Sequence, residues 1–277
     1  MIELNEALKA MVALPVGEKL LKAISNITEC GINSSDFLKR KELRHSIMEE
    51  YAHDTRISPI ERSAVIDNWK TITREYANKT NIVQKAIQCL DSQKDIQPLD
   101  TDWLLLFFEK AKNISNDEMQ QLWGKLLAEE AQNSGRVSKA LLNALSITEG
   151  YQARCFENIC QYCIDTKNGE IMILPIDEEL ETLACFERDV FEELDDLGYV
   201  KLMQMGYTSY DVYLLKGNYR EKQISIENAE KGISIGQVSL TKMGKTLSSF
   251  IEKRYDENFI NMLKEFCDKK HYVFSIT

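Results

Sequence analysis

The stretch WLLLFFEKAKNISNDEMQQLWGKLLAEE, from Trp103 to Glu130, decides the fold of the N-terminal half of the chain. Its first six residues, Trp103–Phe108, are all apolar. Because six residues advance by about 500° around an α-helix, this segment is apolar on every side and must be largely buried. The part of the stretch that follows Ser115 is a second, amphipathic helix. We expect four of its polar side chains to face water: Gln120, Gln121, Lys125 and Glu129. The stretch therefore predicts a helical hairpin over 102–132 at the core of a helical bundle.

Two capping boxes mark helix starts along the same half of the chain. Ser58-Pro59-Ile60-Glu61 and Ser115-Asn116-Asp117-Glu118 each place a hydroxyl three residues before a glutamate. The first box predicts a long helix that reaches Ile87, with a break near 78–81. Residues 90–102 then form a predicted loop, since Pro98 ends any helix before it.

Further amphipathic segments complete the expected bundle. Val16–Ile32 carries one apolar stripe, and two more arms are expected from eight apolar and cysteine positions: Val137, Leu141, Leu142, Leu145, Phe156, Ile159, Cys160 and Cys163. The basic cluster Lys39–Arg44 follows the first of these segments. An apolar helix beside a basic patch is also typical of peripheral membrane contact, which stays open as an alternative to docking in the bundle.

The pattern changes to mixed helices and strands after Gly169. Helices are predicted over 178–184, 188–197, 242–253 and 257–269, and strands alternate with them up to the final HYVFSI. Two helices followed by a glycine turn and a β-hairpin outline a winged helix-turn-helix. We therefore predict a mainly α protein: a helical domain over 1–165, followed by a smaller winged-helix-like α+β domain over 170–277.

The composition limits the compartment and the class of partner. The 277 residues carry 34 Lys and Arg against 44 Asp and Glu, a net charge of −10, which disfavours a general nucleic-acid binder. The N-terminus has acidic residues before any apolar run and no secretory signal, and no apolar run approaches the ~20 residues of a spanning helix. Seven cysteines, an odd number, fit reduced thiols. These features predict a cytoplasmic protein without a transmembrane segment.

Two cysteine patterns could hold a metal. Cys155, Cys160 and Cys163 have the C-x4-C-x2-C spacing of plant-type iron–sulfur sites, but they fall on a predicted helix without a glycine, so core packing is favoured. Cys267 and His271 stand four residues apart, as two zinc ligands on one helix face would, without further ligands nearby.

No common catalytic template is present in the sequence. The chain has three histidines and no Gly-rich phosphate loop, G-x-S-x-G or H-E-x-x-H motif. The paired carboxylates Asp195-Asp196 and Glu129-Glu130 occur where a solvated helix face would place them. We therefore expect no catalytic, cofactor-binding or metal residues, and no cofactor.

The charge of the predicted recognition helix argues against DNA binding. Residues 177–196 contain ten acidic residues and a single basic one, Arg188, so this segment repels phosphates. Basic residues elsewhere in the domain keep DNA as an alternative: Lys216, Arg220 and Lys222 in the predicted hairpin that would form the wing, and Lys242, Lys245, Lys253 and Arg254 in the helix over 242–253 and directly after it.

A family resemblance extends over both halves of the chain. The run Asp102-Trp103-Leu104, Phe107-Phe108, Glu118-Met119-Gln120, Leu122-Trp123-Gly124, Leu127-Ala128 and Glu130 resembles the DWL…FF…EMQxLWGxxLAxE signature of an uncharacterised bacterial family known only as a domain of unknown function. Leu240-Thr241, Gly244 and Leu247 match its C-terminal LT-x2-G-x2-L element. Pro15, Lys19-Leu20, Ile24-Ser25 and Gly31-Ile32 are similar to a segment of abortive-infection-type proteins.

Two positions depart from the family pattern. Ser134-Gly135 stands where the family usually has Pro-Gly, and Asn33-Ser34-Ser35 replaces basic residues, which weakens a membrane role. The resemblance implies no reaction; it implies a bacterial protein encoded near mobile elements and phage-defence genes. We therefore expect a non-catalytic, oligomerising regulator or effector with a protein partner or a second copy. A DNA-binding transcription-type regulator and an enzyme with an unrecognised site are the alternatives.

Overall fold

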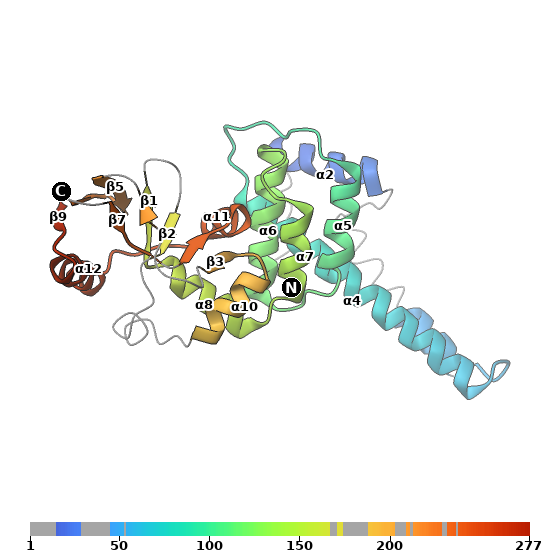
Figure 1. The fold of residues 1–277 in the computed structure, drawn as a ribbon. Helices are drawn as coiled ribbons and strands as arrows, with labels where there is room; N and C mark the ends of the chain where they lie inside the picture. Colours follow the sequence, from blue (N-terminus) through green and yellow to red (C-terminus); the bar gives the residue numbers. More distant parts are fainter. Residues whose placement is uncertain are drawn as a thin grey trace. The chain divides into compact units, whose positions relative to one another are not determined.

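The protein is mainly helical and carries a small antiparallel sheet in its C-terminal part (Figure 1). This computed structural model describes residues 15–28, 45–52, 54–166, 171–173, 188–202, 209–210, 213–228, 232–236 and 238–277. The chain divides into two compact units, Met1–Ser146 and Ile147–Thr277. None of the described helices combines the length and the apolar composition needed to cross a lipid bilayer.

The first unit is built of helices. A helix over 45–52 accompanies five labelled ones: α2 (Pro15–Thr28), α4 (Pro59–Cys89), α5 (Thr101–Ala111), α6 (Asp117–Gln132) and α7 (Lys139–Ile147). The predicted capping box at Ser58 is formed, since the Ser58 hydroxyl accepts from Glu61 N and the Glu61 carboxylate accepts from Ser58 N. The predicted box at Ser115 is wrong by one residue, because the cap of α6 is Asn116, whose side chain accepts from Met119 N.

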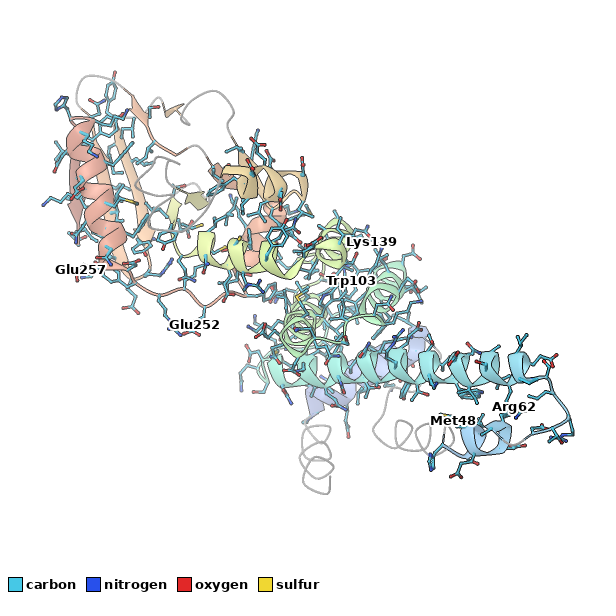
Figure 2. The ribbon with its side chains drawn as sticks, turned by 90° about the horizontal axis from the view of Figure 1, so that it is seen from below. Met48, Arg62, Trp103, Lys139, Glu252 and Glu257 are labelled. Atoms are coloured by element: carbon cyan, nitrogen blue, oxygen red, sulfur yellow. The ribbon has the colours of Figure 1, made fainter. Side chains whose placement is uncertain are left out.

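The long helix α4 is continuous, whereas the sequence predicted a break near 78–81. The side chains of Asn78 and Thr80 do not interrupt the helix because both form hydrogen bonds within the protein. The Asn78 amide donates to Lys112 O at 2.8 Å, and the Thr80 hydroxyl donates to Tyr76 O at 2.9 Å. The buried residues of α4 begin at Thr73. The N-terminal half of α4 extends beyond α5, α6 and α7; Figure 2 labels Arg62 near its end and Met48 on the helix over 45–52 beside it.

Helix α2 buries its apolar stripe within the first unit. Val16, Leu20 and Ile24 are buried, and α2 packs against α4 and α5. This face is therefore covered by protein and does not present an apolar surface to lipid. The basic cluster Lys39–Lys41, on which the membrane alternative depended, lies outside the described residues.

Helix α5 supplies the aromatic centre of the first unit, as predicted. Trp103 and Phe107 stack with ring centroids 5.2 Å apart, and Phe107 also meets the Trp123 ring of α6 at 5.2 Å. All three side chains are almost fully buried. Burial is not uniform around the helix, because Leu105 remains 50% exposed.

The crossing of α4 and α6 depends on a glycine. A Cβ added at Gly124 would lie 2.8 Å from Lys85 Cβ and 2.9 Å from Ala86 N of α4. Contacts below 3.0 Å with backbone cannot be relieved by a side-chain rotation, so any larger residue would push the two helices apart. Gly124 therefore sets the closest approach of these helices.

The second unit combines helices with strands. Its helices are α8 (Gly150–Cys160), α10 (Arg188–Asp196), α11 (Lys242–Ser248) and α12 (Glu257–Lys269). Its strands are β1 (Cys163–Thr166), β2 (Ile171–Ile173), β3 (Val200–Leu202), β4 (Ser209–Tyr210), β5 (Leu214–Tyr219), β6 (Lys222–Glu227), β7 (Ile233–Ser234), β8 (Val238–Leu240) and β9 (Val273–Ile276). Seven strands form one antiparallel sheet in the order β3-β8-β2-β1-β5-β6-β9, and β4 pairs with β7.

One core of this unit lies between α12 and the β5–β6–β9 part of the sheet. Phe259, Leu263 and Cys267 of α12 are buried in one cluster with Tyr219 and Ile224 of the sheet. The Tyr219 and Phe259 rings approach to 4.8 Å between centroids. This packing fixes the C-terminal helix, whose bounds are those predicted from the sequence.

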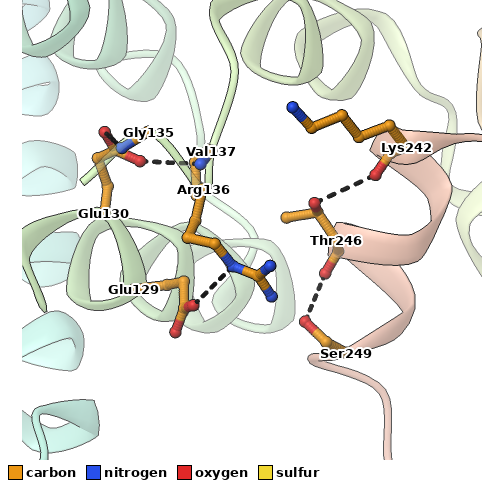
Figure 3. Close-up of polar contacts among 8 residues, drawn as sticks. All are labelled: Glu129, Glu130, Gly135, Arg136, Val137, Lys242, Thr246 and Ser249. Carbon is orange, nitrogen blue, oxygen red and sulfur yellow. Dashed lines mark hydrogen bonds and ion pairs between the residues drawn. The ribbon is translucent and has the colours of Figure 1, made fainter. Parts of the chain in front are cut away.

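Three boundaries differ from the sequence prediction. The first unit ends at Ser146 rather than near 165, and α8 packs on α10 within the second unit. Cys163 opens a strand and is not part of a helical arm. The helix predicted over 242–253 ends at Ser248, where the Thr246 hydroxyl donates to Lys242 O and the Ser249 hydroxyl to Thr246 O (Figure 3). The predicted helix over 178–184 lies outside the described residues.

The aromatic centre makes a stability prediction. Replacing Phe107 by Ala should lower the free energy of unfolding by about 3–5 kcal/mol, because the substitution removes a fully buried ring and leaves a cavity among two tryptophans. Chemical denaturation monitored by tryptophan fluorescence measures the change. Leu105→Ala on the same helix is the matched control and should cost much less, since Leu105 is half exposed. Equal losses in the two variants would contradict a buried α5 centre.

Candidate functional site

The signature residues of α5 and α6 converge on one loop of the first unit. Glu130 is buried, and its two carboxylate oxygens accept from Gly135 N at 2.7 Å and Val137 N at 2.8 Å (Figure 3). The Trp103 indole donates to Val137 O at 2.7 Å. The pairing with Glu129 predicted that Glu130 lies on a solvated helix face, and this prediction is wrong. The Glu130 carboxylate instead binds the backbone of the loop that leads into α7. Glu129 does lie nearer to solvent and meets Arg136.

Gln120 corrects a second expectation about the signature. It is buried instead of facing water, and its amide donates to Ile114 O at 2.8 Å and to Asn78 Oδ1 at 3.3 Å. Since Asn78 in turn donates to Lys112 O, two buried amides join α4, α6 and the connection between α5 and α6. Buried polar side chains of this kind are stable only when hydrogen-bonded, which these are.

The C-terminal signature element is also structural. The Thr241 hydroxyl donates to Gly198 O at 2.6 Å and accepts from Gly244 N, so it caps α11 and binds the turn after α10. A Cβ added at Gly244 would lie 1.9 Å from Tyr199 O. The signature residues thus explain how the helices pack and supply no reactive group.

The cysteines of the predicted metal motif are separated by the fold. Cys155 lies partly exposed on α8, whereas Cys160 and Cys163 are buried where α8 ends and β1 begins. Burial raises the pKa of the Cys155 thiol, which keeps it protonated at neutral pH. Among the residues that the structure describes, no group of three or more His, Cys, Asp or Glu side chains could hold a metal ion.

The Cys267–His271 pattern does not form a helical ligand pair. Helix α12 ends at Lys269, and His271 occupies a left-handed turn with φ of 58°. Cys267 is buried in the core, and burial raises its pKa to about 12. Of the other histidines, His45 is exposed beside Glu49, and His53 lies outside the described residues.

The most distinctive described surface of the second unit is the acidic face of α10. Phe191 and Leu194 are buried, while the carboxylates of Asp189, Glu192 and Asp196 are exposed. These positions follow the i, i+3, i+7 spacing of one helix face. We call these three residues the α10 acidic face.

Hydrogen bonds to the other two carboxylates fix the position of α10. Glu193 accepts from the Tyr151 hydroxyl and from the Gln152 amide, which lower its pKa, so it is ionised at neutral pH. Asp195 accepts from Leu202 N at 3.2 Å. The α10 acidic face is therefore presented on a helix that is attached both to α8 and to β3.

Comparison with known proteins gives one family. The model described as "Protein of unknown function (DUF2806)" matches residues 69–209. The chain belongs to this family. No curated protein and no solved structure matches the chain. The DUF2806 match runs from α4 to β4, so it includes the aromatic centre, the Glu130 loop and the α10 acidic face, and it confirms the expected family of unknown function.

The Glu130 carboxylate makes a second stability prediction. Glu130→Gln replaces one acceptor oxygen by an NH2 group that faces a backbone N–H, so it should lower the free energy of unfolding by about 1–3 kcal/mol. Glu129→Gln, one residue away and nearer to solvent, is the matched control and should be close to wild type. Urea denaturation of the three proteins measures the difference. If the two variants were equally stable, the carboxylate would not hold the loop.

The cysteine geometry predicts a protein without a stoichiometric metal. Purified protein should be colourless and contain neither iron nor zinc in proportion to chain, because Cys155 is not grouped with Cys160 and Cys163. Elemental analysis of protein purified without chelators is the measurement. About one metal ion per chain would contradict the assignment of these thiols to the core.

Proposed function

We propose that this DUF2806 protein is a non-catalytic regulator or effector that acts through protein–protein contacts, and that the α10 acidic face is its docking surface for a basic partner. The observation that carries the proposal is the placement of three exposed carboxylates on one face of a helix that hydrogen bonds attach to α8 and to β3. A role in bacterial phage defence or stress response is part of the proposal and rests on the sequence resemblance alone.

The connectivity around α10 supports a winged-helix-like frame as part of this proposal. Helix α10 passes through a turn at Gly198, with φ of 76°, into β3; β3 pairs with β8, and β8 pairs with β2. A helix followed by two antiparallel strands, the second of which also pairs with a strand before the helix, is the strand order of a winged helix; here the connection between β3 and β8 is long and carries β4 to β7, so the predicted β5–β6 hairpin is not next to β3 in the sheet. In such frames the helix before the hairpin is the one presented to the partner.

This connectivity favours DNA binding as a second candidate function, but the charges on the frame oppose it. Asp189, Glu192 and Asp196 are exposed on α10, and each carboxylate near a phosphate is repelled. Arg220, which the sequence suggested as part of a basic wing, is instead bound to protein: its guanidinium donates to Gln161 O at 2.5 Å and to Arg254 O at 3.0 Å. A basic protein segment fits the α10 acidic face better than a duplex does.

The docking surface is tested by charge reversal. The triple variant Asp189→Lys, Glu192→Lys, Asp196→Lys should lose the protein that co-purifies with a tagged chain in its native host. A triple variant on α12 makes the same change of net charge at three exposed positions of the same unit, Glu257, Glu265 and Asp268, and should retain that protein. Quantitative mass spectrometry of the two preparations and wild type gives the comparison. A partner retained equally by all three would contradict docking on α10.

The DNA alternative is tested by fluorescence anisotropy with random and upstream-region duplexes across a salt series. Wild type should bind no duplex more tightly than about micromolar at physiological salt, the tight end of non-specific binding. The α10 reversal should gain salt-dependent affinity if the frame is a winged helix, and the α12 reversal should gain less. Nanomolar binding of wild type to one duplex, with a clear salt slope, would replace the proposed function by a transcription-type regulator.

A further inference from the structure

Two buried thiols of the second unit lie next to each other at the junction of α8 and β1. Cys160 is 0% exposed and Cys163 is 3% exposed. The backbone bonds Gln161 N to Asn158 O and Tyr162 N to Ile159 O continue a helical turn, which brings residues three apart onto the same side. The Cys163 thiol donates to Ile159 O at 3.7 Å, so it points back toward the last turn of α8, which carries Cys160. A separation of three residues in such a turn is compatible with the Cα separation that a disulfide requires.

Gln161, the first of the two residues between the cysteines, joins three segments of the chain. Gln161 O accepts from the Tyr219 hydroxyl at 3.1 Å and from Arg220 at the tip of the β5–β6 hairpin. The Gln161 side chain donates to Glu252 O at 3.0 Å and accepts from Arg254 N at 2.9 Å. The turn that carries both thiols is therefore held by the hairpin and by the extended segment before α12, which Glu252 and Glu257 mark in Figure 2.

The charges around the pair make the two thiols unequal. Burial opposes ionisation of Cys160, but the neighbouring Cys163 thiol and the cations Lys253 and Arg220 act in the opposite direction and lower the pKa of Cys160. Burial raises the pKa of Cys163, and the neighbouring Cys160 raises it further. One sulfur is thus prepared to act as a nucleophile, and the other stays a thiol.

We propose that Cys160 and Cys163 are a redox-active dithiol that forms an intramolecular disulfide on reaction with a hydroperoxide. The Cys160 thiolate attacks a peroxide oxygen, the O–O bond breaks, and Cys160 becomes a sulfenic acid while the leaving oxygen departs as water or an alcohol after taking a proton. The Cys163 sulfur then attacks Cys160 Sγ, the S–O bond breaks, and water leaves with the Cys163 proton. Two thiols and one hydroperoxide give one disulfide and two hydroxyl products; a small dithiol reverses the step by thiol–disulfide exchange.

The surrounding geometry gives the reaction its selectivity. Residues 252–256, which hydrogen-bond to Gln161 in the turn between the two cysteines, lack regular secondary structure. The side chains of Glu252 and Arg254 are more than 80% exposed. Local opening of such a segment needs less energy than unfolding a helix or strand, so a peroxide-sized molecule gains access to thiols that a bulky reagent does not reach.

The experiment is peroxide titration of the folded full-length chain, followed by intact mass measurement and non-reducing peptide mapping. The expected product has lost two hydrogen atoms, carries a disulfide between Cys160 and Cys163, and returns to the starting mass with dithiothreitol. Cys89→Ser and Cys155→Ser, at partly exposed cysteines outside the pair, should form the same disulfide. Urea-unfolded wild type should form it more slowly, because unfolding removes the cations and the turn.

In the Cys163→Ser variant, the reaction with peroxide should stop at the Cys160 sulfenic acid, because no second thiol is present to displace its oxygen. A cyclic 1,3-diketone traps this sulfenic acid as a stable adduct. If this variant does not fold, the wild-type peptide map decides alone. The proposal is overturned if folded wild type keeps both thiols reduced while Cys89 or Cys155 is oxidised. It is also overturned if the disulfide found joins other cysteines, or if it forms equally fast in urea.

Discussion

The close approach of α6 to α4 at Gly124 is the constraint on which the first unit depends. Because a Cβ there would lie within 3.0 Å of the α4 backbone, only glycine lets the two helices meet at this distance. The approach brings the Gln120 amide of α6 within reach of Asn78 of α4. The hydrogen-bonded amides are thus a consequence of one small residue, since this pair would not meet if the two helices stood farther apart. The neighbouring residue of α6, Trp123, packs on Phe107 of α5, so the third helix joins the same core.

The elements of this fold that depend on local periodicity could be predicted from the sequence. The buried hairpin of α5 and α6, the capped start of α4 and the bounds of α12 all follow from apolar spacing and capping residues. The continuity of α4 could not, because it depends on Asn78 finding Lys112 O, a partner far away in the sequence. The unit boundary at Ser146 is likewise set by the packing of α8 on α10, which no local pattern records.

The polar positions show a second limit of periodicity. Gln120 and Glu130 carry polar side chains, so a hydrophobic pattern places them on the solvent face. Both are buried because each satisfies main-chain groups that helix ends and loops leave without partners. A glutamate shortly before a glycine-containing loop was the available signal, since a carboxylate can bind two successive N–H groups. The prediction for Arg220 failed for the same reason. Its charge predicted a place in an exposed basic wing, whereas its guanidinium donates to two backbone carbonyl oxygens.

The use of Arg220 inside the second unit bears on the choice between the candidate functions. To contact a phosphate, Arg220 would have to give up its hydrogen bonds to Gln161 O and Arg254 O and its position over the Tyr219 ring, 4.5 Å from the centroid. Hydrogen bonds to a charged group contribute about 1.5–3 kcal/mol each, so one phosphate contact does not offset the loss of two of them. Arg220 is thus committed to the fold, and the exposed side chains that the structure describes on α10 include the carboxylates of Asp189, Glu192 and Asp196. A surface of that sign selects a cationic partner, which is why we propose that α10 binds protein and not DNA.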